Sequence, residues 1–126
     1  MNKTFKLFIF FSFFLFFKSV YAEVLLTKTL QAGKEKAETI CAACHGVTGK
    51  AESGGNSGAV PNIYAQQRDY LTIKLKDYRS GKLHHPQMTL IAQMLSDEDI
   101  ENVSEWYSRI KVEIIDPSIS LSDPGQ

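Results

Sequence analysis

The chain contains no phenylalanine after residue 22, because all eight phenylalanines lie between positions 5 and 17. Removing residues 1–22 from the 126-residue chain leaves 104 residues. Their aromatic side chains are Tyr64, Tyr70, Tyr78, Trp106 and Tyr107. A domain this small is near the lower limit at which an apolar core holds a fold together by itself. We therefore expect something other than side chains to fill part of the interior.

An excess of positive charge is also missing after residue 22. Three of the 14 Lys and Arg residues precede that point, which leaves 11, whereas all 14 acidic residues follow it. The net charge of the remainder is therefore about −3. Phosphate recognition needs a basic surface. We expect no nucleic-acid partner.

No apolar run in the chain has the length of a membrane span. The most apolar stretch, residues 7–17, has 11 residues with one serine among them, and a spanning helix needs about 20. Two lysines precede this run, and the small residues Val20 and Ala22 follow it, which is the layout of a secretory signal peptide. We expect cleavage after Ala22, export to the periplasm and no membrane span in the mature chain, with an uncleaved anchor as the alternative.

The chain has only two cysteines, and they belong to a Cys41-Ala42-Ala43-Cys44-His45 motif. Such a C-x-x-C-H sequence is typical of c-type haem attachment. On a helix, residues i, i+3 and i+4 share one face. Both thiols can then form thioethers with the haem vinyl groups while His45 presents a ring nitrogen to the iron. We expect one covalently bound haem c.

Three other interpretations of the two cysteines are weaker. A thioredoxin-like redox pair needs a βαβ context, which the sequence does not indicate. A zinc site usually takes four protein ligands, and the spacing from Cys44 to His84 and His85 matches no zinc finger. A disulfide between Cys41 and Cys44 would close a very small loop and stabilise little.

The sixth ligand of the iron is sought among Met88, Met94, His84 and His85. Met94 directly precedes a helix start and is well placed as core filler, whereas Met88 lies in a stretch predicted to be irregular. Ligation by Met and His raises the reduction potential, so Met88 would suit an electron carrier. Pro61 is a candidate to accept a hydrogen bond from the other ring nitrogen of His45 through its carbonyl.

The remaining patterns predict an all-α chain. Helices are expected over Leu30–Cys44 and Gln67–Ser80, the second closed by Gly81. A third helix should begin after Ser96, with Asp99 completing a capping box, and run to about Ile110. Residues 46–60 form a glycine-rich loop, residues 112–115 could extend like a short strand, and the remainder is a tail.

These blocks, in this order, resemble the soluble class I c-type cytochromes of bacteria. The resemblance covers Gly33 to Ile110 and rests on five segments: Cys41 to Gly46, Val60 to Ile63, Gln66 to Leu75, Tyr78 to Gly81, and Pro86-Gln87-Met88 followed by Leu95 to Ile100. It implies a cytochrome c-like fold with three main helices around one covalently attached haem and long connecting loops. It implies a haem domain over residues 23–112 and a C-terminal extension over 113–126.

The resemblance also implies roles for individual residues. Cys41 and Cys44 would form the thioethers, and His45 would be an axial ligand oriented by the Pro61 carbonyl. It points to Met88 rather than Met94 as the other axial ligand. It further implies that the first and last helices cross near Gly33, against Tyr107.

The function expected from all of this is one-electron transport. We expect a periplasmic carrier, not an enzyme, that cycles haem iron between Fe(III) and Fe(II) and exchanges electrons with respiratory or dehydrogenase partners as a monomer or weak dimer. One alternative is an electron-accepting subunit of a periplasmic dehydrogenase, docking through the 46–60 loop or the tail. Another is a haem-based ligand sensor or peroxidase-like enzyme.

Overall fold

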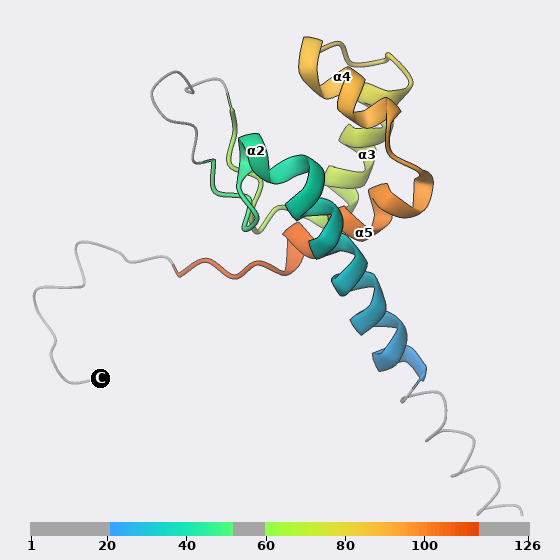
Figure 1. Cartoon of the computed structure of the whole chain (residues 1–126), viewed down its shortest axis with the longest axis vertical. Coiled ribbons are helices and arrows are strands. Elements are labelled where there is room, and N and C mark those ends of the chain that lie inside the picture. The colour runs from blue at the N-terminus through green and yellow to red at the C-terminus, as the bar shows by residue number, and fades with distance from the viewer. Residues whose placement is uncertain (1–20, 52–59, 114–126) are drawn as a thin grey trace, which may run out of the picture.

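The computed structural model describes residues 21–51 and 60–113, and all regular structure within these two ranges is helical (Figure 1). This confirms the predicted all-α class. Nearly all of the predicted signal peptide, residues 52–59 of the glycine-rich loop and residues 114–126 of the tail lie outside the described residues. Within the described ranges, no helix combines the length and apolar character that a membrane span requires.

The first helical region is longer than predicted. Residues 21–36 are α-helical, followed without a break by the π-helix η1 (Ala37–Cys41) and by α2 (Ala42–His45). The predicted start at Leu30 is therefore wrong. Residues 21–28 are exposed and project away from the rest of the chain (Figure 1). The apolar pattern begins only where the helix meets the core, so it marked burial rather than the start of the helix.

The second helix, α3 (Arg68–Arg79), confirms its prediction to within one residue at each end. Gln67 and Ser80 are its two caps. Gly81 follows the C-cap with a φ of 78°, a left-handed conformation that glycine adopts without steric cost. The chain can therefore turn sharply there toward the next element.

The segment carrying Met88 is a helix and not an irregular stretch. It is α4 (Pro86–Gln93), so the described residues contain one main helix more than the three expected. Pro86 occupies the first helical position, where its fixed φ suits a helix and its missing N–H costs no hydrogen bond. Pro86 therefore starts a helix in a stretch that the sequence analysis had predicted to be irregular.

The last helix, α5 (Asp97–Arg109), has the predicted capping box. The Ser96 hydroxyl accepts a hydrogen bond from the Asp99 N–H at 3.0 Å, and the Asp99 carboxylate accepts one from the Ser96 N–H at 3.0 Å. Ile110 ends the helix. Val112 and Glu113 are not in a strand, so the expected extension is wrong for these two residues, and its other two lie outside the described part.

The core forms where α3 packs against α4 and α5 and where the first helix crosses α5. The predicted crossing at Gly33 is present, but its partner is different. A Cβ on Gly33 would lie 2.1 Å from the Asn102 carbonyl oxygen and 3.0 Å from the Trp106 Cβ. Tyr107 packs one turn further along the first helix, against Ala37.

Candidate functional site

The two cysteines lie at the junction of η1 and α2, and both thiols are free. Cys41 is half-buried and packs against the cluster of Ala37, Leu71 and Tyr107, whereas Cys44 is exposed. The π-helix inserts one extra residue per turn just before the motif, and the Ala42 N–H accordingly donates to the Ala37 carbonyl five residues back. Single π turns of this kind are frequent at functional sites.

His45 ends α2 and is only 9% exposed. Its Nδ1 lies 3.0 Å from the Pro61 carbonyl oxygen. A carbonyl can only accept, so Nδ1 carries a proton, and in the neutral ring Nε2 then keeps its lone pair. The hydrogen bond expected between His45 and Pro61 is therefore present, and it fixes the tautomer that a metal ligand needs.

The turn after His45 is fastened by backbone hydrogen bonds to the segment that carries Pro61. The Gly49 N–H donates to the Gly46 carbonyl at 3.1 Å, and the Ile63 N–H donates to the Gly49 carbonyl at 2.8 Å. Gly49 has a φ of 83°, and a Cβ there would lie 2.7 Å from the Tyr64 nitrogen. Only glycine suits this position, which brings the two chain segments close enough for the His45–Pro61 bond.

Two side chains of α5 hold the same turn, a role that the sequence prediction missed. The Tyr107 hydroxyl donates to the Gly46 carbonyl at 3.1 Å, and the Trp106 Nε1–H donates to the Val47 carbonyl at 2.9 Å. Both acceptors are backbone atoms about 60 residues earlier in the chain, separated by 61 and 59 positions respectively. No pattern in the sequence marks such a pairing.

The electrostatics around Cys41 give no sign of an activated thiol. Burial raises the pKa of the Cys41 thiol, while the neighbouring Tyr107 hydroxyl and the charge of Lys36 act in the opposite direction without cancelling the effect. Burial, together with Cys41, raises the pKa of the Tyr107 hydroxyl. Reactive cysteines need a lowered pKa. Cys41 does not have the lowered pKa that a redox-active thiol needs.

Met88 is half-buried in the first turn of α4, a helix that lies away from α2 in Figure 1. α4 packs on α3. Met94 caps the other end of α4 and is 69% exposed, so the prediction that it fills the core is wrong. His84 is exposed. His85 is engaged at the start of α4, where its Nδ1 accepts a hydrogen bond from the Met88 N–H at 3.2 Å.

The donor set fits a covalently attached haem. It offers two free thiols three residues apart and an imidazole whose Nδ1 is committed to Pro61, with Nε2 left to bind iron. The thioether of Met88 is a further donor that haem iron accepts. No group of three or more His, Cys, Asp or Glu side chains capable of holding a metal ion occurs in the described parts of the chain. A zinc site is therefore not supported there.

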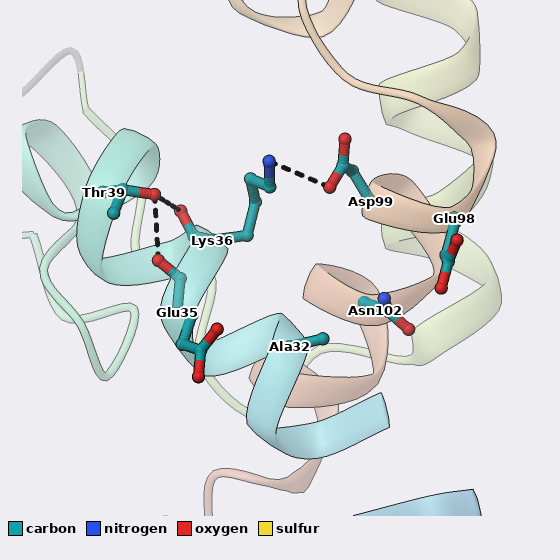
Figure 2. A pocket seen from close by; sticks show the side chains of 7 residues that line it. All are labelled: Ala32, Glu35, Lys36, Thr39, Glu98, Asp99 and Asn102. Atoms are coloured by element: carbon teal, nitrogen blue, oxygen red, sulfur yellow. Dashed lines mark hydrogen bonds and ion pairs between the residues drawn. The ribbon is translucent and has the colours of Figure 1, made fainter. Parts of the chain in front are cut away.

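The first helix and α5 line a separate, open surface pocket of about 460 Å³ (Figure 2). Its lining residues are Ala32, Glu35, Lys36, Thr39, Glu98, Asp99 and Asn102. Lys36 reaches across it to Asp99 at 3.0 Å, as the dashed line in Figure 2 shows. None of the predicted haem residues lines this pocket, and its charged walls do not suit a large apolar group.

Comparisons with known proteins point to one family. Residues 30–109 match the family described as Cytochrome c. Cytochrome c-554(548) of Halomonas halodenitrificans is 40% identical over 80 residues, which cover 61% of this chain and 90% of that protein.

Two further relatives are longer proteins. Cytochrome c4 of Pseudomonas aeruginosa is 31% identical over 75% of this chain and 42% of its own length. The thiosulfate dehydrogenase electron acceptor of Stutzerimonas stutzeri is 36% identical over 59% of this chain and 33% of its own length. The chain thus spans less than half of these two relatives.

Proposed function

The chain belongs to the cytochrome c family, and we propose that it works in the periplasm with Cys41, Cys44 and His45 binding the haem and Met88 completing the iron coordination. It is an electron carrier and not an enzyme, and its cofactor is covalently bound haem c. The haem iron, when bound, supplies the one-electron chemistry by alternating between Fe(III) and Fe(II). The protein holds, shields and tunes that group.

The hydrogen bond between His45 Nδ1 and the Pro61 carbonyl is the observation that supports this assignment best. It fixes the ring orientation and leaves Nε2 as the electron-pair donor. A carbonyl acceptor at Nδ1 also raises the basicity of Nε2 and strengthens an iron bond. The turn over residues 46–49 and its two anchors on α5 keep Pro61 at this distance.

Met88, the other proposed ligand, influences the reduction potential of the haem iron. A thioether favours Fe(II) over Fe(III) relative to a second imidazole, so Met88 makes the carrier more oxidising. Such a carrier would accept electrons from a donor complex and deliver them to a terminal acceptor. We propose that it meets these redox partners transiently, as a monomer or weak dimer, since electron-transfer contacts are small.

The intact mass of the exported protein under denaturing conditions tests the proposal. We expect the mass of residues 23–126 plus one haem, because thioether bonds survive denaturation and the signal peptide is removed. The matched control is Cys41→Ala/Cys44→Ala, which should be exported and cleaved without the added mass. A bare wild-type chain would contradict haem attachment, and a haem-bearing chain of full length would contradict cleavage.

A second candidate function is an electron-accepting subunit of a periplasmic dehydrogenase. The relative described as a thiosulfate dehydrogenase electron acceptor favours it. Purification of the tagged chain from its native host distinguishes the two. Co-elution of a dehydrogenase in fixed proportion would favour the subunit, and elution of the chain alone would favour the free carrier.

A further inference from the structure

The first turn of α4 is held by its preceding histidine. His85 has extended backbone angles (φ −148°, ψ 129°), as an N-cap residue requires. Its Nδ1 accepts the N–H of Met88, three residues later, at 3.2 Å. In return, the His85 N–H donates to the Thr89 hydroxyl at 3.1 Å. An imidazole and a hydroxyl thus form the reciprocal pair that Ser and Glu form in a capping box.

The imidazole that caps α4 is also in contact with α3. The rings of Tyr78 and His85 meet edge to face, with 6.4 Å between centroids and 74° between planes. At the other end of α4, Ala92 and Leu95 are buried in the core. Packing fixes the end of the helix that lies far from Met88. Near Met88, the contacts of His85 hold the helix.

We propose that His85 is a positioning residue for Met88, which keeps the Met88 backbone in place by capping α4 through Nδ1. The inference rests on the proposed ligation by Met88. It also changes the role of His85 from a competing iron ligand to a support for the methionine. The neighbouring His84 is exposed and lies one residue too far from α4 to cap it.

The size of the effect follows from capping energetics. Replacing a good N-cap residue by alanine costs about 1 kcal/mol, which is roughly a fivefold change in an equilibrium constant. An external ligand that displaces Met88 should therefore bind roughly five times more tightly when the cap is lost. Asparagine is a strong N-cap residue and offers a side-chain acceptor without an imidazole.

The experiment compares the ferric holoproteins of the wild type, His85→Ala, His85→Asn and His84→Ala. Each is titrated with free imidazole, and the red charge-transfer band of the iron–methionine bond and the reduction potential are recorded. We expect His85→Ala to bind imidazole about fivefold more tightly and to have a lower potential. His85→Asn and His84→Ala should stay within about twofold of the wild type.

Two patterns would overturn the inference while leaving Met88 as the ligand. In one, His85→Ala behaves like the wild type; in the other, His85→Asn is as impaired as His85→Ala, which would mean that the imidazole itself is needed. A wild type without the charge-transfer band would instead overturn Met88 ligation, and the inference with it.

If His85→Ala does not accumulate, a second variant tests the cap. Thr89→Val removes the hydroxyl that accepts the His85 N–H and should shift imidazole affinity in the same direction. No shift in imidazole affinity would count against the cap.

Discussion

Met88 and Met94 differ in ways that bear on iron ligation. Met88 is half-buried in the first turn of α4, next to the His85 cap, while Met94 ends the helix with 69% of its surface exposed. Both were open to iron ligation on chemistry alone, because each offers a thioether. Their positions on α4 make them a natural pair for mutagenesis.

Met88→Ala is expected to lose the iron–methionine charge-transfer band and to lower the reduction potential by roughly 100 mV or more, within the ~0.8 V range that axial ligands cover. The reduced variant should also bind carbon monoxide rapidly, since its sixth position is open. Spectroscopy and redox titration of the holoprotein measure both effects. Met94→Ala is the matched control and should resemble the wild type. The reverse result would identify Met94 as the ligand.

At the scale of single elements, the start of α5 links charge to stability. Burial disfavours the ionised form of Asp99, but hydrogen bonds from Ser96 and Lys36 outweigh it and hold the pKa of that carboxyl below its ordinary 3.8. The Arg79 guanidinium holds the pKa of Asp97 below 3.8 as well. A carboxyl with a lowered folded-state pKa stabilises the fold above its unfolded pKa, and this contribution is lost as the pH falls through the folded value.

Ser96→Ala should therefore be less stable than the wild type by about 1 kcal/mol at neutral pH, because the cap is lost. The deficit should shrink as the pH falls from neutral through the lowered folded-state pKa of Asp99, because the protonated carboxyl no longer gains from Ser96. Chemical denaturation of the two holoproteins over a pH series from neutral to acid measures this change. Ser108→Ala, whose hydroxyl donates to the Glu105 carbonyl within α5, is the control. A deficit that does not depend on pH would show that the Asp99 carboxylate is not coupled to the cap.

The whole molecule has a small apolar core, and ion pairs join two of its helices. Among the described residues, seven apolar side chains are buried: Ala37, Leu71, Ala92, Leu95, Ile100, Val103 and Tyr107. Arg68 of α3 lies 2.6 Å from Glu101 and 3.0 Å from Glu105 of α5. Exposed ion pairs contribute little, and the buried Glu105 needs its partners mainly to offset its own desolvation.

Haem-free protein made as Cys41→Ala/Cys44→Ala is therefore expected to be largely unfolded, because so small a core cannot offset the conformational entropy of the chain. Circular dichroism during a thermal scan measures this, with the wild-type holoprotein as the reference. The variant should show a weak, gradual loss of helix, in contrast to the single cooperative transition of the holoprotein. A sharp transition in the variant would mean that the protein core suffices.

The sequence by itself determined the features that arise from neighbouring residues. The C-x-x-C-H motif, the bounds of α3 and the Ser96–Asp99 capping box each depend on groups within a few positions of one another. Such interactions need no knowledge of distant contacts, so their sequence signals were reliable. The His45–Pro61 bond was also expected, with Pro61 as a candidate acceptor that the family resemblance then supported, although 16 positions separate its partners.

Only the tertiary structure decided the rest. It showed that the first helix extends back to residue 21, that Pro86 starts a helix, and that Gly33 meets Asn102 and Trp106 rather than Tyr107. It also showed that Trp106 and Tyr107 hold the turn after His45. These features depend on how helices cross. A helix crossing is set by which side chains fit together across the core. These side chains come from distant parts of the chain, so local sequence patterns do not predict which of them will meet.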